Sequence, residues 1–208
     1  MITTPDGLVL EGAWSPPDGD AVGCVVFCHP HPLDGGTMNA PLMQLVAATL
    51  AEAGLWTLRF NFRGVGTSQG TWGGGSGEVL DVAAAVEFAA AAHPALPIGV
   101  AGWSFGASTS LRWQAETRSP LPWAGIAPGI RAYRGAAPPA VAGLMVTPRL
   151  IVLGDRDQFA SVEEMQEFAA AFGAEVAVLE GSDHFFHYRE RSVGALVAGH
   201  FGGRRIPD

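Results

Sequence analysis

The segment Gly102-Trp103-Ser104-Phe105-Gly106 follows an apolar run at residues 98–103 and opens a helical pattern at residues 105–117. A strand that turns directly into a helix around Gly-x-Ser-x-Gly is the setting of a nucleophilic serine. Glycines two residues to either side let the strand and the helix approach closely enough to hold Ser104 in a strained turn, with its hydroxyl clear of the backbone. The pattern is short enough to arise by chance, so its weight depends on what the rest of the chain supplies.

Short apolar runs alternate with segments of helical spacing along the rest of the chain. We expect strands at residues 22–28, 55–60, 98–103, 123–127, 150–154 and 175–179, and a hairpin from residues 1–4 and 8–14. We expect helices at residues 41–53, 76–92, 105–117, 161–172 and 187–200. This alternation predicts an α/β protein with a mostly parallel sheet of about seven or eight strands and helices on both faces. We expect one domain over residues 1–208.

Three local patterns carry more specific expectations. Ser76 is a candidate N-cap, followed by Glu78 and Asp81 where acidic residues suit the helix dipole. Ser161-x-x-Glu164 predicts a capping box at the start of the helix expected at residues 161–172. The glycine-rich residues 59–70 lack the lysine of a phosphate loop, so we expect a turn held by Arg63 on a nearby carboxylate.

Composition excludes several classes of protein. The chain has 208 residues, 48% hydrophobic and 15% charged, which excludes a disordered protein. The formal net charge of −8 argues against nucleic acid as a partner. All twelve basic residues are arginine, so a lysine Schiff base is impossible. Cys24 and Cys28 on one strand stand about 13 Å apart, too far for a disulfide. With no leader-like or membrane-spanning run, we expect a cytoplasmic protein without a membrane partner.

Two further polar segments follow expected strands. Gly154-Asp155-Arg156-Asp157 comes after residues 150–154, and Ser182-Asp183-His184 comes after residues 175–179. Parallel strands end at one edge of a sheet, so these segments are expected to meet Ser104 there. We interpret Ser104 as the nucleophile, His184 as general base and then acid, and Asp157 as the acid that orients His184. Asp155 in place of Asp157, and His187 in place of His184, remain alternatives.

A developing oxyanion needs two donors, and the backbone N–H of Phe105 is the first candidate. The second is expected from the loop at residues 29–37, where Pro30 and Pro32 have no N–H to give. His31 and Leu33 remain, and we favour His31. The neighbouring His29 and His31 lack a convincing third ligand, so we expect no metal and interpret these side chains as fixing the loop. We expect Leu33, Trp72 and Trp103 to bind substrate, and Phe185 and Phe186 to lie in the core.

At these residues the sequence resembles the α/β-hydrolase superfamily, and most of all the small lidless bacterial serine hydrolases related to dienelactone hydrolases. The resemblance spans roughly residues 1–200. The matching motifs are His29-Pro30-His31-Pro32 with Gly35-Gly36, Arg59-Phe60-Asn61-Phe62-Arg63-Gly64, the segment at residues 102–106, Gly154-x-x-Asp157, and Asp183-His184-Phe185-Phe186. Dienelactone hydrolases carry a cysteine nucleophile, and Ser104 stands in its place here, which argues against their particular lactone substrate.

The resemblance implies hydrolysis of carboxylic esters without a cofactor. The connection at residues 128–148 is too short for a lid domain, so we expect an open and fairly shallow pocket. Our hypothesis is a serine esterase that acts on small or medium acyl esters through an acyl-enzyme, as a monomer or homodimer whose partner is a small-molecule ester. A thioesterase or peptidase with the same three residues, and a non-catalytic binding protein on the same scaffold, remain alternatives.

Overall fold

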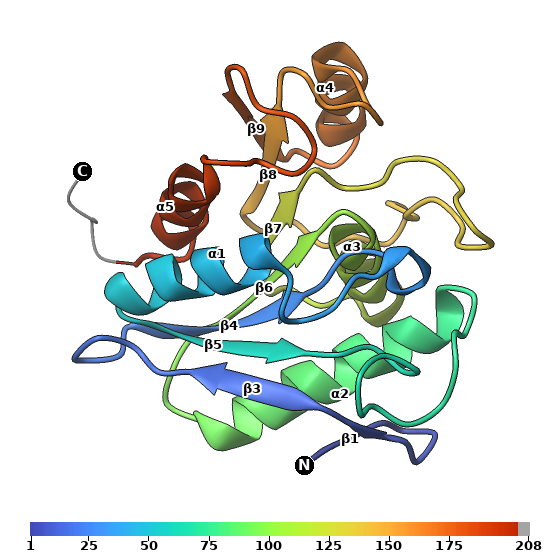
Figure 1. Cartoon of the computed structure of the whole chain (residues 1–208), viewed down its shortest axis with the longest axis vertical. Helices are drawn as coiled ribbons and strands as arrows, with labels where there is room; N and C mark the ends of the chain where they lie inside the picture. Colours follow the sequence, from blue (N-terminus) through green and yellow to red (C-terminus); the bar gives the residue numbers. More distant parts are fainter. Residues whose placement is uncertain (204–208) are drawn as a thin grey trace.

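Within residues 1–203, the main sheet has seven strands in the order β3-β5-β4-β6-β7-β8-β9. The computed structural model describes residues 1–203 (Figure 1). The strands are β3 (Gly12–Ser15), β4 (Gly23–Cys28), β5 (Leu55–Phe60), β6 (Ile98–Trp103), β7 (Trp123–Ile126), β8 (Arg149–Gly154) and β9 (Glu175–Leu179). Only the edge strand β3 pairs antiparallel, with β5, and all other neighbours are parallel. The predicted α/β class, with a mostly parallel sheet, is confirmed.

Helices cover both faces of this sheet (Figure 1). They are α1 (Pro41–Glu52), α2 (Ser76–Ala92), α3 (Phe105–Thr117), α4 (Val162–Ala170) and α5 (Glu190–His200). Helices α1 and α5 pack together on one face, α2 and α3 pack together on the other, and α4 lies against β8 and β9. Among residues 1–203, none of the helices combines the length and the apolar character that a membrane crossing requires.

The central strands form the core because their side chains are covered on both faces. Every residue of β4 and β8 is buried, as expected for apolar runs in a parallel sheet. Cys24 and Cys28 both lie on β4 as free, buried thiols, as the sequence predicts. Burial raises the pKa of Cys24 to about 12 and raises that of Cys28 as well, so both thiols stay protonated.

The structure corrects two expectations in the N-terminal half of the chain: the extent of the first hairpin and the N-cap of α2. The expected hairpin forms only a two-stranded sheet of β1 (Ile2–Thr3) and β2 (Val9–Leu10), because the chain then leaves it and joins the main sheet as β3. Ser76 is not the N-cap of α2, since Gly75 takes that position with a left-handed φ of 85°. The Glu78 carboxylate caps the helix by accepting the N–H groups of Gly73 and Gly75, each at 2.8 Å.

The other helix boundaries differ by a few residues. The capping box at Ser161 and Glu164 is confirmed, and the helix that it opens ends at Ala170 rather than at residue 172. The last helix begins at Glu190 rather than at residue 187. Residues 187–189 instead lie in the turns between β9 and α5. The loop that follows β9 is therefore longer than the helical spacing of the apolar residues predicts.

A buried ion pair joins the loop after β5 to α2. The Arg63 guanidinium donates to Asp81 Oδ1 at 2.7 Å, and the Arg63 backbone N–H donates to Asp81 Oδ2 at 2.9 Å. Arg63 also pairs with Asp6 of the N-terminal hairpin at 2.9 Å. The predicted arginine–carboxylate turn is therefore present. Asp81 is fully buried and pairs with Arg63 rather than simply complementing the helix dipole.

We expect Asp81→Asn to lower the free energy of unfolding by about 3 kcal/mol, because it leaves the buried Arg63 charge without its main partner. Chemical denaturation measures this change. The matched control is Glu116→Gln, which removes the exposed pair with Arg112 and is expected to cost less than about 1 kcal/mol. Equal effects of the two substitutions would contradict the role given to the buried pair.

Candidate active site

Ser104 occupies a strained turn between β6 and α3. Its φ is 53° and its ψ −114°, a conformation that costs energy for a residue with a side chain. A Cβ at Gly106 would stand 2.3 Å from the Cys28 carbonyl oxygen, and one at Gly102 would stand 2.4 Å from the Ala107 nitrogen. Glycine is therefore required at both positions, and the strand and helix come close enough to hold the turn.

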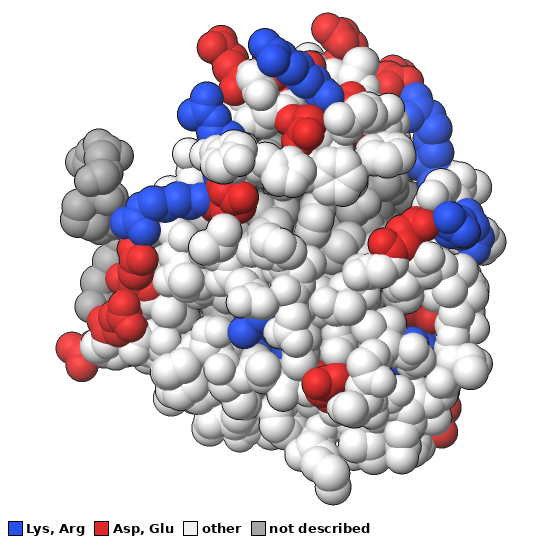
Figure 2. Space-filling view, viewed as in Figure 1, with Lys and Arg blue, Asp and Glu red and all other residues white. Residues whose placement is uncertain are grey.

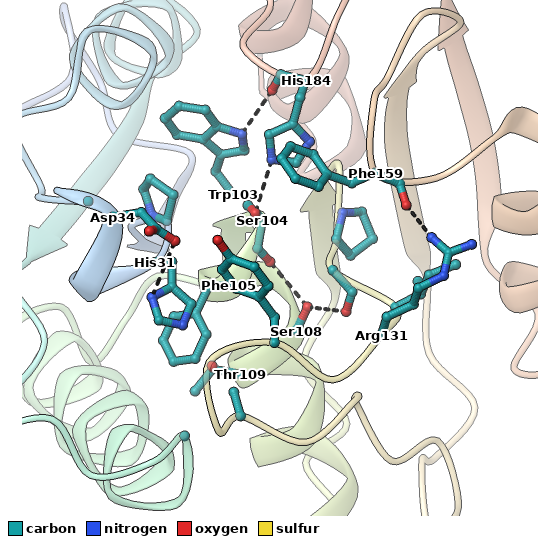
Figure 3. Close-up of a pocket in the computed structure, with 18 of the residues that line it drawn as sticks. His31, Asp34, Trp103, Ser104, Phe105, Ser108, Thr109, Arg131, Phe159 and His184 are labelled. Carbon is teal, nitrogen blue, oxygen red and sulfur yellow. Dashed lines mark hydrogen bonds and ion pairs between the residues drawn. The ribbon is translucent and has the colours of Figure 1, made fainter.

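The side chains of Ser104, His184 and Asp157 form one hydrogen-bonded line at the carboxyl edge of the sheet, and Figure 3 shows its Ser104–His184 part. His184 Nε2 lies 3.0 Å from Ser104 Oγ, and His184 Nδ1 lies 2.8 Å from Asp157 Oδ2. The Asp157 carboxylate accepts a hydrogen bond from Nδ1–H, so Nε2 is left unprotonated as the acceptor for the serine hydroxyl. Three segments that are distant in the sequence therefore meet in the order nucleophile, base and acid.

His184 and Asp157 are each held by a further hydrogen bond. Trp103 Nε1 donates to the His184 carbonyl at 3.2 Å. Asp157 Oδ1 accepts the backbone N–H of Phe159 at 2.8 Å, which leaves Oδ2 directed at the imidazole. The first contact holds the His184 backbone, and the second orients the Asp157 carboxylate, before any ligand arrives.

The alternative residues lie elsewhere. Asp155 Oδ1 accepts the backbone N–H of Gly181 at 2.7 Å and so fastens the loop after β9. The side chain of His187 is 68% exposed, and its contact is with Asp183, at 3.8 Å. Of the acids and histidines that the sequence left open, the structure places Asp157 and His184 beside Ser104.

Phe105 and His31, the two residues expected to supply backbone donors, both line the cavity at Ser104. Phe105 is the first residue of α3, where an N–H has no partner within the helix. His31 precedes a short 3-10 helix, η1 (Pro32–Asp34), and its ring Nδ1 accepts the Leu33 N–H at 3.2 Å. Because the Leu33 N–H is already used, His31 is the better of the two candidates for a second donor.

His29 fixes the loop that carries His31. Its Nε2 accepts the Phe62 N–H at 3.0 Å, and its Nδ1–H donates to the Pro30 carbonyl at 2.6 Å. Burial lowers the pKa of His29 to about 4, so the ring is neutral and both nitrogens are occupied. These contacts agree with the interpretation that the His29 side chain fixes the loop. No group of three or more metal-ligating side chains gathers within residues 1–203.

A cavity of about 530 Å³ lies in front of Ser104. Figure 2 shows that this face of the molecule is largely uncharged at its centre, with charged side chains gathered around α4 and at the edges. Trp103 lines the cavity as expected. Leu33 and Trp72 do not line it: Leu33 is half exposed, and the Trp72 ring packs behind the wall against Phe105, with ring centroids 5.3 Å apart.

The connection between β7 and β8 forms one wall of this cavity. Residues 128–133 and 136–137 of the connection line it, and Arg134 pairs with Asp34 on the opposite loop at 2.8 Å. The connection forms no lid domain, as we expect from its length, and it contributes one wall of the cavity.

Phe159 and Phe185 lie at the mouth of the cavity, a position that the sequence analysis does not predict for either residue. The sequence predicts Phe185 and Phe186 in the core, but Phe185 is 45% exposed and lines the cavity, whereas Phe186 is fully buried. Phe159 also lines the cavity and is 54% exposed. Its position two residues after Asp157, in the same loop, is the signal that could have identified it.

Comparison with known proteins finds similarity to a serine aminopeptidase family and to solved serine hydrolases. The family model described as serine aminopeptidase, S33, matches residues 19–142. An alpha-beta serine hydrolase homologue from Coxiella burnetii is 35% identical, with 96% of this chain and 98% of that chain covered and a TM-score of 0.80. XC6422 from Xanthomonas campestris, a serine hydrolase without lid, is 26% identical, with 99% and 94% covered and a TM-score of 0.84. RP471 of Rickettsia prowazekii, an uncharacterized protein, is 28% identical over 93% of this chain and 84% of that protein.

We expect the free energy of unfolding to fall as the pH drops from 6.5 toward 4, because the unfolded chain protonates His29 near 6.5 and the folded protein only near 4. The contribution lost is about 3 kcal/mol. Denaturation at several pH values measures the slope. His29→Asn, which cannot titrate, should flatten the slope in part, because burial also lowers the pKa of His31 and His200. An unchanged slope would contradict the buried neutral state of His29.

Proposed function

Because the chain belongs to the serine aminopeptidase S33 family of α/β-hydrolases, we propose that it cleaves small to medium carboxylic esters through an acyl-enzyme. The observation that carries this proposal is the contact of 3.0 Å between Ser104 Oγ and His184 Nε2, continued to Asp157 at 2.8 Å. A serine hydroxyl is a weak nucleophile, and a neighbouring base that is already oriented makes it a strong one.

The reaction proceeds in two halves. Ser104 Oγ attacks the ester carbonyl carbon while His184 Nε2 takes the hydroxyl proton, and Asp157 stabilises the imidazolium that forms. The tetrahedral intermediate collapses as His184 gives this proton to the alcohol oxygen, and the C–O bond to the alcohol breaks. Water then attacks the acyl-enzyme, losing a proton to His184, which returns the proton to Ser104 as the acid leaves.

The negative charge on the carbonyl oxygen needs fixed donors. The backbone N–H groups of Phe105 and His31 are proposed for this role, the first aided by the positive end of the α3 dipole. Each such donor typically contributes about 10²- to 10³-fold to turnover. The hydrogen bonds of His29 keep the His31 loop in place, so no reorganisation is needed when the charge develops.

The cavity supports an ester over a peptide with a free amino terminus. An aminopeptidase needs an anionic group to hold the substrate ammonium. Among the described residues that line the cavity, Asp34 is the one carboxylate, and it pairs with Arg134 at 2.8 Å. A substrate panel of an aryl ester, an acyl-CoA and a peptide anilide tests this choice. Faster turnover of the acyl-CoA or the anilide would replace the esterase by a thioesterase or a peptidase.

We expect Ser104→Ala to lower the turnover of p-nitrophenyl acetate by about 10⁶-fold, because the three side chains act as a unit. A fluorophosphonate probe should label the native chain at Ser104 and leave this variant unlabelled. Retention of most of the activity in the variant would refute the assigned nucleophile. Absence of labelling in the native protein would favour a non-catalytic binding protein.

Asp157→Asn should lower kcat by about 10⁴-fold, because an amide in this position holds His184 in the wrong tautomer. Asp155→Asn is the matched control in the same loop, and it should leave kcat within about threefold since Asp155 contacts Gly181 instead. Steady-state kinetics on one ester compares the two. The reverse ranking would move the orienting acid to Asp155.

A further inference from the structure

The two half-exposed phenylalanines at the mouth of the cavity have backbones that are held by hydrogen bonds. The Phe159 backbone is fixed on both sides, because its N–H donates to Asp157 Oδ1 at 2.8 Å and its carbonyl accepts from Arg131. The Phe185 N–H donates to Asp183 Oδ1 at 2.9 Å. Large apolar side chains that stay in water on a fixed backbone form a surface prepared for an apolar ligand.

Both rings flank the imidazole of His184. The Phe159 and His184 centroids are 4.5 Å apart with the planes at 67°, and the Phe185 and His184 centroids are 5.6 Å apart at 84°. Trp103 closes the arrangement, with its ring 6.3 Å from that of Phe185. Figure 3 shows Phe159 directly beside His184, above Ser104. We call Trp103, Phe159 and Phe185 the aromatic rim.

The chemistry of the proposed reaction decides which part of a substrate meets this rim. His184 Nε2 must pass its proton to the alcohol oxygen, so the alcohol has to lie against the imidazole when the C–O bond breaks. The carbonyl oxygen faces the Phe105 and His31 N–H groups instead. The rim around His184 is therefore positioned to contact the alcohol rather than the carbonyl oxygen.

We propose that the aromatic rim is a binding site for the alcohol part of the substrate and selects esters of aromatic alcohols. This inference rests on the proposed function and names the substrate class. Aromatic rings prefer the offset and edge-to-face contacts that three differently inclined rings offer. The rim itself carries no formal charge, and the nearby Arg131 is paired with Glu164, so an apolar alcohol fits better than a charged one.

Two acetate esters separate this site from the rest of the reaction. 2-Phenylethyl acetate and propyl acetate give the same acetyl-enzyme and leave as alcohols of similar acidity. The ratio of their kcat/KM values therefore reports the alcohol alone. We expect the native protein to favour 2-phenylethyl acetate by at least about tenfold, which is the range of discrimination in apolar pockets.

Phe159→Ala and Phe185→Ala should each lower kcat/KM for 2-phenylethyl acetate more than for propyl acetate, so that the preference falls by about three- to tenfold. The matched control is Leu45→Ala on α1, which removes an apolar side chain of similar exposure, 48%, outside the cavity and should leave the ratio unchanged. An unchanged ratio in both phenylalanine variants, or a native preference for propyl acetate, would overturn the inference.

Binding of the free alcohol makes the test independent of turnover. Calorimetry with 2-phenylethanol and the Ser104→Ala protein should detect binding that Phe159→Ala or Phe185→Ala, added to that variant, weakens by about tenfold. Binding that neither substitution changes would overturn the rim even if both esters are cleaved. If neither ester is cleaved by the native protein, the proposed function fails, while rim-dependent binding of the alcohol would still support the aromatic site.

Discussion

The close approach of α3 to the end of β4 is the constraint on which the site depends. Gly106 lies so near the Cys28 and His29 carbonyls that a single added carbon would overlap them. This approach holds the positive φ of Ser104 and also brings the first N–H of α3 beside the loop that carries His31. One backbone contact thus positions the serine and both candidate donors, and the energy stored in the turn is balanced by the packing of the whole parallel sheet.

Much of this arrangement follows from the sequence, for identifiable reasons. Residues 55–60, 98–103 and 175–179 are strands with the predicted limits, because each is a short apolar run bounded by turn residues. Parallel strands end at one edge, so the order of Ser104, Asp157 and His184 along the chain predicts that they meet. The capping box at Ser161 is equally local, and both of its partners are within one turn.

The expectations that failed depend on distant parts of the chain. Gly75 rather than Ser76 is the N-cap of α2, because the Glu78 carboxylate accepts the Gly75 N–H at the buried start of the helix. Phe185 and Phe186 have the same side chain, and only the direction of the loop after β9 places one in water and the other in the core. Leu33 and Trp72 do not line the cavity, and one of its walls comes instead from the connection between β7 and β8, whose path no local pattern predicts.

The two cysteines on β4 have a practical consequence. Both thiols lie at the centre of the sheet and stay protonated, so an alkylating reagent reaches them only when β4 separates from its neighbours. No other cysteine competes for the reagent. The rate of alkylation under native conditions therefore reports how often the sheet opens at β4. The measurement needs no introduced cysteine and no denaturant.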